Sequence, residues 1–498
     1  MNEPEKPLTQ ELENNQKPLE VSPSQLPEKP KKSSRKLFEI LALVFVPVAI
    51  IVACLLFFNN KDNSLKNNID DSSVAWSTYG EQEITLSESL EITTPGIYTL
   101  TGSLSDGMIE INTPGIVKLV LNNASIVNSS GPAILVSEAE TVFIETAEGT
   151  TNYLSDSTKY NLSDDDIKAT LFSKDDLVLQ GSGKLVVTGN FEDGIVSKDD
   201  LKITSGTYEI NSKDEGIRGR DSVYIAGGTF DIVSGGDAIK SNNSDEIGKG
   251  TVLIDSGEIT ISAGDDGIHA ESSTEINGGK IDIKKSYEGI EGSTIKITGG
   301  EISVVSSDDG LNAAGGNDSS SPNTRTYQSS SSNYWIEING GTIHVDSAGD
   351  GIDSNGSLTI NGGTVIVDGP ANSANGALDS ETDVVYNGGT VIAVGASGMA
   401  VAPGNKSSGY SISAFLDKTY SAGTTISVKN SAGENVLSYA PIKSFSHLSL
   451  SSPEFKEGET YTIFLNDSEY ESVTLSEKTT RVGFSIEGQM MPGGGFRR

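Results

Sequence analysis

Acidic side chains recur at a nearly fixed spacing in the middle of this chain, each followed by a small residue and an aliphatic residue. The small residue falls at positions 194, 216, 238, 267, 289, 310, 351 and 376, so the separations are 22, 22, 29, 22, 21, 41 and 25 residues. A period near 22 residues with insertions is typical of a solenoid, in which equivalent positions line up in space. The aligned acids are Asp193, Glu215, Asp237, Asp266, Glu288, Asp309 and Asp350, and the eighth copy carries Asn375.

Carboxylates stacked in this way would repel one another. Successive coils of a solenoid of strands lie about 4.8 Å apart. Two like charges at that distance repel by about 1 kcal/mol in water and by about 3.5 kcal/mol at an effective dielectric of 20. A hard divalent cation, which takes about six to eight oxygen ligands, would remove this repulsion. We therefore predict Ca²⁺ at more than one level, with ligands among Glu192, Asp193, Asp214, Glu215, Asp237, Asp265, Asp266, Glu288, Asp308, Asp309 and Asp350.

A simpler interpretation of each acidic copy needs no metal. Asp-Gly is a common turn dipeptide, and its carboxylate often accepts hydrogen bonds from nearby backbone N–H groups. Repetition of the copies, several with a second acid directly in front, favours the metal. Asp199, Asp200 and Asp221 could form a second acidic column or could cap strands, and the sequence leaves both interpretations open.

Groups suited to catalysis are few. A lyase that acts on uronates needs an unprotonated Arg or Lys as its base, and Arg218, Arg220 and Lys240 are the candidates beside the acidic column. We expect these side chains to form ion pairs with the column instead. The three histidines are dispersed without metal-ligand spacing, and we expect them to be solvated strand residues. No catalytic residue is predicted.

The elements that must position the acids are short strands. In residues 272–292 the apolar residues alternate in three runs separated by Gly, Ser or Asn, and the same layout recurs in neighbouring segments. One such coil cannot bury its aliphatic residues, but a stack of coils can. We predict an all-β fold, a right-handed parallel β-helix over residues 76–405. A β-propeller is disfavoured because its blades need about twice this period. Loops are expected at 150–168 and 313–333.

Residues 406–487 are predicted to be a small β-rich C-terminal module that covers the open end of the solenoid, and 488–498 form a glycine-rich tail. Residues 37–58 are a nearly uninterrupted apolar run that is long enough to span a bilayer as one transmembrane helix. Basic residues stand just before it, which predicts a cytoplasmic N-terminus and an extracellular solenoid. Residues 1–36 are expected to be a disordered cytoplasmic tail, and 59–75 a linker.

The net charge of the chain is −34. Residues 1–58 hold seven acidic and seven basic side chains, so the whole negative excess belongs to the predicted extracellular part. This charge excludes nucleic acid as a direct partner and favours cations. The single cysteine, Cys54, lies in the apolar run, so disulfide bonds are not expected outside the membrane.

Three features together resemble a known family: the Asp-Gly-Ile copies, the Asn-Gly-Gly-Thr strand openings, and the closing motifs at 438–445, 458–461 and 492–496. The chain resembles, over about residues 75–485, a bacterial carbohydrate-binding family with a calcium-binding, pectate-lyase-like parallel β-helix that lacks clear lyase activity. The resemblance implies binding of cellulose-like or pectin-like polysaccharides. It also implies that Asp265, Asp266, Asp308 and Asp309 are calcium ligands.

The sequence thus predicts a single-pass cell-membrane protein that binds polysaccharide outside the cell in a calcium-dependent manner and without catalysis. Two alternatives remain open. The chain could be a calcium-dependent polysaccharide lyase acting on uronates, or a structural surface adhesin whose calcium only stiffens the stalk.

Overall fold

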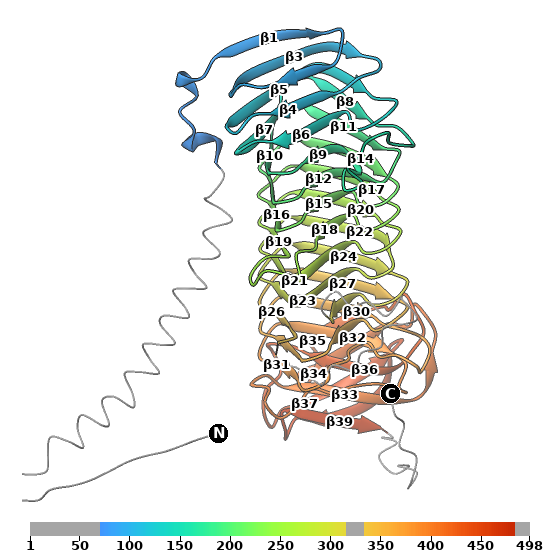
Figure 1. Cartoon of the computed structure of the whole chain (residues 1–498). Helices are drawn as coiled ribbons and strands as arrows, with labels where there is room; N and C mark the ends of the chain where they lie inside the picture. The colour runs from blue at the N-terminus through green and yellow to red at the C-terminus, as the bar shows by residue number, and fades with distance from the viewer. Residues whose placement is uncertain (1–69, 315–332, 484–498) are drawn as a thin grey trace, which may run out of the picture. The chain divides into compact units, whose positions relative to one another are not determined.

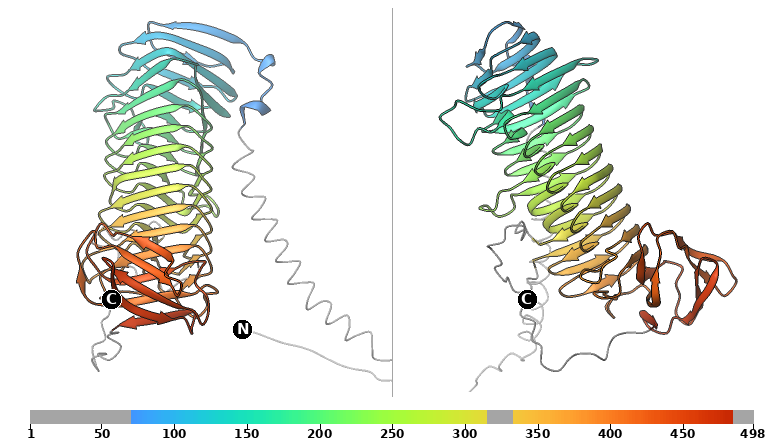
Figure 2. Two further views of the ribbon diagram at one scale, coloured as in Figure 1. Left: turned by 180° about the vertical axis from the view of Figure 1, so that it is seen from behind. Right: turned by 90° about the vertical axis from the view of Figure 1, so that its right-hand side faces the viewer.

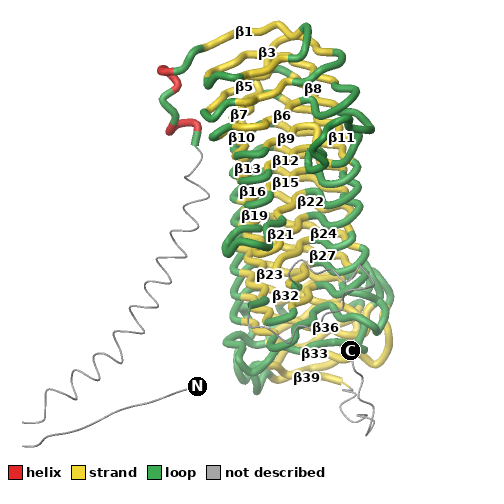
Figure 3. The backbone as a smooth tube through the Cα atoms, in the orientation of Figure 1, coloured by secondary structure: helices red, strands yellow, loops and turns green. Residues whose placement is uncertain are grey.

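Residues 70–314 and 333–483 are described by the computed structural model of this chain. Figure 1 shows them wound into a stack of coils, and Figure 3 shows that nearly all of their regular structure is strand. Two short 3-10 helices, η1 (Asp71–Ser73) and η2 (Trp76–Thr78), precede the first strand. Hydrogen bonds join 35 strands into one sheet, and four more strands form a second sheet. The predicted all-β fold is therefore confirmed.

The long sheet is a parallel β-helix. Most coils contribute three short strands, and each strand pairs in parallel with its equivalent in the next coil, as Ile195 does with Ile217, Leu201 with Val223, and Tyr208 with Phe230. The successive coils appear in Figure 2 as parallel arrows stacked along one axis. Equivalent strands therefore form three faces of the stack, which we call A, B and C in chain order within a coil.

Face A carries the strands that follow the acidic residues. It contains β2 (Leu90–Ile92), β4 (Ile109–Asn112), β6 (Ile134–Glu138), β9 (Ala169–Ser173), β12 (Asp193–Ser197), β15 (Ile217–Gly219), β18 (Ile239–Ser241), β25 (Leu311–Ala313), β28 (Ile352–Ser354) and the first parts of β21 (Ile268–Ile276) and β23 (Ile290–Ile297).

Face B receives the second parts of β21 and β23. Its other strands are β1 (Glu81–Leu86), β3 (Gly96–Leu104), β5 (Ile116–Val127), β7 (Thr141–Thr146), β10 (Asp176–Gly181), β13 (Asp200–Ile203), β16 (Ser222–Ile225), β19 (Thr251–Ile254), β26 (Trp335–Ile338), β29 (Ser357–Ile360) and β31 (Val384–Tyr386).

Face C begins at the ends of β3 and β5, where Ser125 pairs with Tyr153. It continues through β8 (Thr151–Ser155), β11 (Lys184–Gly189), β14 (Thr207–Ser212), β17 (Thr229–Val233), β20 (Glu258–Ser262), β22 (Lys280–Ser286), β24 (Glu301–Ser306), β27 (Thr342–Ser347), β30 (Thr364–Asp368) and β32 (Thr390–Gly395).

Columns of aliphatic side chains fill the centre of the stack. On face A, for example, Ile217 pairs with Ile239, Ile239 with Ile268, and Ile268 with Ile290, and all four side chains are fully buried. Burial of an isoleucine side chain stabilises a fold by roughly 1.5–3 kcal/mol. The period of the aliphatic residues therefore fixes the register of the coils, and with it the position of every acidic residue.

Glycine is required where face B turns into face C. Gly279, for example, has φ +90°, and a Cβ there would lie only 2.8 Å from the carbonyl oxygen of Gly257 in the preceding coil. Any side chain would thus be strained by the backbone conformation and would collide with the preceding coil. The repeated Gly-Gly pairs of the sequence mark this corner.

The C-terminal module continues the sheet of face C with the chain direction reversed. Its strand β36 (Phe445–Ser451) pairs antiparallel with β32, and β33 (Ser411–Tyr420) lies on the other side of β36. The module is completed by β39 (Thr479–Gly483), beside β33, and by a separate antiparallel sheet of β34 (Ile426–Asn430), β35 (Asn435–Tyr439), β37 (Thr460–Leu465) and β38 (Ser468–Thr474).

One loop expectation is partly wrong. Residues 150–168 do not form a single loop, because Thr151–Ser155 is the strand β8 and extends face C. The rest of the segment does leave the stack, and its Tyr160 ring stacks on Phe191 at a centroid distance of 4.5 Å. The polar sequence of 150–158 hides a strand whose alternate residues, such as Leu154, are buried in the common core.

Several predicted segments lie outside the described residues. These are 1–36, 37–58, most of the linker 59–75, most of the loop 313–333 and the tail 488–498. Among residues 70–314 and 333–483, no helix has the length and apolar character needed to cross a membrane.

Candidate functional site

The repeated acids lie in one row along the start of face A, and their carboxylates link successive coils. Asp193 Oδ1 accepts a hydrogen bond from Glu215 N at 3.2 Å, and Asp237 Oδ1 accepts one from Asp266 N at 2.9 Å. Asp309 Oδ1 likewise accepts from Asp350 N at 2.6 Å. The turn interpretation is therefore correct for one oxygen of these aspartates. The second carboxylate oxygen of each remains for other partners. We call this set the acid row: Asp193, Glu215, Asp237, Asp266, Glu288, Asp309 and Asp350.

A second row, which we call the charge row, runs beside the acid row three residues further along each coil. Its members pair across neighbouring coils in register, so their side chains point outward from adjacent strands of face A. The charge row changes along the stack from three cationic residues to two acids with one asparagine between them. It consists of Arg218, Lys240, His269, Glu291, Asn312 and Asp353.

The cations of the charge row neutralise the first half of the acid row. Arg218 Nη2 lies 2.6 Å from Asp193 Oδ2, and Lys240 Nζ lies 3.0 Å from Glu215 Oε1 and 2.7 Å from Asp237 Oδ2. Two cations of the chain thus offset much of the negative charge of three acids in these coils.

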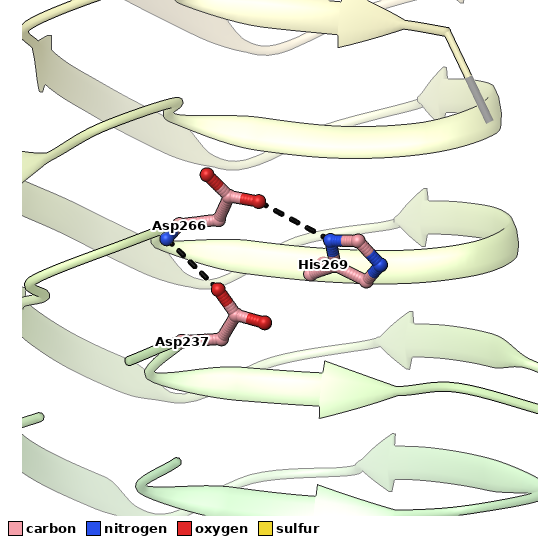
Figure 4. Close-up of side chains that lie close together, drawn as sticks. All are labelled: Asp237, Asp266 and His269. Carbon is pink, nitrogen blue, oxygen red and sulfur yellow. Dashed lines mark hydrogen bonds and ion pairs between the residues drawn. The ribbon is translucent and has the colours of Figure 1, made fainter. Parts of the chain in front are cut away.

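His269 is the last cation of the charge row. Figure 4 shows it beside Asp266, whose carboxylate Oδ2 is 3.2 Å from Nδ1, and Glu291 Oε2 lies 2.6 Å from the same nitrogen. Burial alone would lower the pKa of His269, but the two carboxylates raise this pKa to about 11. The expectation of a solvated histidine is wrong here, because the side chain is only 7% exposed and its charge is fixed by ion pairs.

Among residues 70–314 and 333–483, no such compensation reaches Asp309 and Asp353. Ligand oxygens of Asp309, Asp350 and Asp353 lie within 4.8 Å of one another. Burial, followed by the neighbouring carboxylates, raises the pKa of Asp309 to about 8 and that of Asp353 to about 7. Burial and nearby acids also raise the pKa of Glu288 to about 10. The second half of the acid row therefore holds closely spaced acids without a neutralising side chain at Asp309 or Asp353.

Asn312 provides an independent sign of an absent partner. Its Nδ2 donates to Glu288 Oε2 at 2.8 Å, whereas its Oδ1 is buried and has no hydrogen-bond donor among the described residues. The residue is only 5% exposed, and its strand neighbour in the next coil is Asp353. A buried acceptor without a donor is costly, and a cation would satisfy it.

The other four predicted ligands stand directly before the acid row. Glu192 approaches Asp193 and Asp214, with ligand oxygens within 4.8 Å, and Glu192 also pairs with Lys168 at 3.0 Å. Asp265 and Asp308 precede Asp266 and Asp309. Glu291, Asn312 and Asp353 are possible ligands that were not predicted from the sequence. Each lies two residues after a repeated small residue, and this spacing could have identified them.

A further acidic cluster lies at the corner between faces A and B. One oxygen each of Asp176, Asp199 and Asp200 lies within 4.8 Å of the others. Burial and neighbouring aspartates raise the pKa of Asp176 to about 6 and that of Asp199 to about 7. Asp221 instead bonds to the ammonium group of Lys249. Asp176, Asp199 and Asp200 therefore form a second acidic column. This column ends at Asp221, whose carboxylate is paired with Lys249.

All three candidate catalytic bases are ion-paired. Arg218 and Lys240 bind the acid row, and Arg220 Nη2 lies 3.0 Å from Asp245 Oδ2. Burial alone would lower the pKa of Lys240, but Asp237 and Glu215 raise this pKa well above its usual range. Lys240 therefore remains an ammonium ion at neutral pH and cannot accept a proton.

Two cavities of the described part of the chain differ in their position relative to the charged rows. The larger, of about 590 Å³, lies between loop 402–405 and residues 476–481, far along the chain from the charged rows. The smaller, of about 250 Å³, opens on the cationic half of the charge row, beside Lys240 and His269.

Comparisons with known proteins agree with the resemblance predicted from the sequence. Residues 87–320 match the family model described as carbohydrate-binding domain-containing protein. A protein of Acetivibrio thermocellus with the same description is 37% identical over 165 residues, which are 32% of this chain and 53% of that protein. The match thus spans about half of the relative's length. The predicted family resemblance is confirmed over the matched residues.

A solved structure is also similar to part of this chain. It is described as a polysaccharide lyase-like protein from C. thermocellum, in a gadolinium derivative. The two chains share 31% sequence identity, the match covers 46% of this chain and 95% of that one, and the TM-score is 0.40.

Proposed function

We propose that this chain, whose residues 87–320 match the carbohydrate-binding domain model, binds polysaccharide outside the cell with the help of calcium and without catalysis. Face A is the binding surface in this proposal. The N-terminal segment 37–58 anchors the protein in the cell membrane, a role that rests on its sequence alone.

One observation carries the calcium part of the proposal: the loss of cations from the charge row after His269. Carboxylate oxygens of Asp309, Asp350 and Asp353 converge to within 4.8 Å of one another, and the buried Oδ1 of Asn312 has no donor among the described residues. Oxygens bound at about 2.3–2.6 Å to one Ca²⁺ can be up to about 5 Å apart. The donor set consists entirely of oxygen atoms, which suits Ca²⁺. These four residues would hold the ion, and Asp308 or Glu288 could extend the set.

A bound ion would have two effects at this site. It would remove the repulsion between carboxylates that burial keeps close together. If each of the four side chains supplies one oxygen, two to four of the about six to eight coordination positions of calcium remain for other ligands. Hydroxyl or carboxylate oxygens of a glycan can occupy such positions. Calcium thus reconciles a strongly acidic protein with a polyuronate ligand.

The absence of catalysis is supported by the state of the candidate bases. A lyase must remove a proton from carbon, and a group that acts as base must be unprotonated at the working pH. Lys240 is held as an ammonium ion between Asp237 and Glu215. The geometry gives no specific support to the lyase alternative.

Retention on insoluble polysaccharides tests the proposal. The purified full-length protein in detergent should bind one or more insoluble glucans or pectates in millimolar Ca²⁺, and excess chelator should release it. Metal analysis after extensive dialysis should find tightly held calcium. The double variant Asp309→Asn/Asp353→Asn should lose this calcium, whereas Asp231→Asn, on the exposed part of face C, should retain it.

The same preparation separates the alternatives. A calcium-dependent rise in ultraviolet absorbance with polygalacturonate would support the lyase instead. If calcium binds but no polysaccharide retains the protein, only the structural stalk remains. If the protein holds no calcium and chelator changes nothing, the metal part of the proposal is wrong.

A further inference from the structure

The cavity beside the charge row is built from two adjacent coils. Asp237, Lys240 and Asn242 come from the coil of β18, and the equivalent residues of the next coil supply the opposite side. Its volume of about 250 Å³ lies just below the range of roughly 300–1,000 Å³ typical of pockets for drug-sized ligands. One sugar ring of a longer chain matches this size. The second coil contributes Asp265, Asp266, His269 and Glu271.

An insertion borders the cavity. The coil from position 238 to position 267 has 29 residues, against 22 in the two coils before it. The additional residues form a loop between β18 and β19, which begins at Asn242. Ion pairs hold this loop against the stack, since Arg220 binds Asp245 at 3.0 Å and Lys249 binds Asp221. The loop is therefore fixed in place and can form a preorganised wall.

Both cationic side chains of the cavity are already paired with acids. Lys240 bridges Glu215 and Asp237, and His269 bridges Asp266 and Glu291. No surplus cation remains to bind the carboxylate of a uronate or a phosphate. The ammonium group of Lys240 already lies against the second oxygen of Asp237, where a metal ion would have to bind, although ligand atoms of Asp237, Asp266 and His269 lie within 4.8 Å of one another. An anionic ligand and a metal are both disfavoured.

The polar groups that remain suit hydroxyl groups. No hydrogen bond or ion pair joins the side chains of Asn242 or Glu271 to any described residue. The amide of Asn242 both donates and accepts, and the carboxylate of Glu271 accepts. Lys240 has a third N–H beyond the two used in its ion pairs, and the Nε2 atom of His269 is not used by its carboxylate partners. The cavity thus offers both donors and acceptors, as the hydroxyl groups of a pyranose require.

We propose that this cavity is a metal-independent subsite for a neutral, polyhydroxylated sugar residue of a polysaccharide. Asn242 and Glu271 bind hydroxyl groups directly, and the paired charges of Lys240 and His269 line the floor. The subsite rests on the proposed function, since it assigns a place on face A to the glycan. It differs from the acidic half of that face in needing no calcium.

Calorimetric titration of the full-length protein tests the subsite. The probes are neutral hexasaccharides of glucose and of mannose, and hexagalacturonate, each with Ca²⁺ and with excess chelator. At least one neutral hexasaccharide should bind equally well under both conditions. The double variant Asn242→Ala/Glu271→Ala should weaken this binding at least tenfold. It should leave the calcium-dependent binding of hexagalacturonate unchanged.

Two control variants match the substituted residues. Asn355 occupies the position equivalent to Asn242 four coils further on, outside the cavity, and Glu258 is an exposed glutamate of face C. Asn355→Ala and Glu258→Ala should bind the neutral probe as the unchanged protein does. Neither pair of changes breaks an ion pair, so folding should be retained, and a thermal melt checks this.

The outcomes separate the subsite from the proposed function. If the double variant binds the neutral probe normally, or if chelator abolishes neutral binding, the subsite is wrong. If hexagalacturonate binds with calcium while both neutral probes fail, the subsite is wrong and the proposed function stands. If neutral binding depends on Asn242 and Glu271 while calcium has no effect on any ligand, the subsite stands and the calcium proposal is wrong. Failure of every glycan overturns both.

Discussion

His269 Nδ1 lies 2.6 Å from Glu291 Oε2, at the point where the outward row of face A changes from cations to acids. The two residues are strand neighbours in adjacent coils. On one side of this pair the chain supplies its own positive charges to the acid row. On the other side, Asp309 and Asp353 have no such partner among the described residues. The pair is therefore the boundary between a self-neutralised half and a half that we expect to require metal.

Substitution of His269 should be strongly destabilising. His269→Ala leaves the buried carboxylates of Asp266 and Glu291 without their cation, and loss of one partner of a buried ion pair costs about 3–5 kcal/mol. His269→Lys keeps a positive charge and should recover part of this loss. Urea unfolding of both variants measures the difference. Equal stability of the alanine variant and the unchanged protein would contradict the charged state assigned to His269.

Removal of calcium should destabilise the second half of the solenoid more than the first. A ligand present at 100 times its dissociation constant stabilises the folded state by about 2.7 kcal/mol. Addition of chelator should therefore accelerate hydrogen exchange more strongly in β25 and β28 than in β15 and β18. Asp353→Asn should reduce the effect of chelator, and Asp231→Asn should not. Uniform exchange along the stack would argue against a localised metal site.

The pH dependence of the metal-free protein follows from Asp309 and Asp353. Their pKa values in the folded state, about 8 and about 7, are raised from 3.8. A raised carboxyl pKa contributes stability that is complete below the unfolded pKa and is lost as pH rises through the folded pKa. The chelated protein should thus be more stable at pH 5.5 than at pH 8.5. Calcium affinity should change in the opposite sense, because calcium binds the deprotonated form.

Melting curves in chelator and calcium titrations at these two pH values check both trends. The Asp309→Asn/Asp353→Asn variant is the control and should show a smaller pH effect. A chelated protein that gains stability between pH 5.5 and 8.5 would contradict the raised pKa values.

The junction between solenoid and C-terminal module should depend on Asp368. This fully buried carboxylate accepts hydrogen bonds from Tyr439 Oη and from Ile442 N, and His344 Nε2 lies 2.8 Å from its Oδ2. Tyr439→Phe removes one donor from a buried acceptor, which costs about 1–3 kcal/mol. Proteolysis should then cut more readily between β32 and β36. Ile442→Ala, a change at an exposed side chain, should have little effect.

The sequence predicted those features that depend on the repeat itself. The aliphatic columns and the corner glycines recur because each coil must stack on the next, so the period predicted the β-helix and the alignment of the acid row. The pairing of Arg218 and Lys240 with the acid row was predicted and is confirmed, but Glu291, Asn312 and Asp353 were missed because the residue type of the charge row differs in every coil. Arginine, histidine and aspartate all fit a position that points away from the core. Only the register of the coils therefore identifies such a position.

The histidines illustrate the same limit. His269 and His447 are both buried, yet the first is held charged between carboxylates, whereas burial lowers the pKa of the second to about 4. Nothing in the local sequence distinguishes them, because their partners are Glu291 in the next coil and Ser413 in another strand of the module. Such pairings appear only when the coils are stacked.

The reversed strand β36 also bears on self-association. A parallel β-helix presents at its end the same backbone groups that its own coils use for pairing, so a second molecule could in principle add to it. On face C that edge is occupied by β36, which runs in the opposite direction. A second molecule therefore cannot add a parallel coil directly to β32.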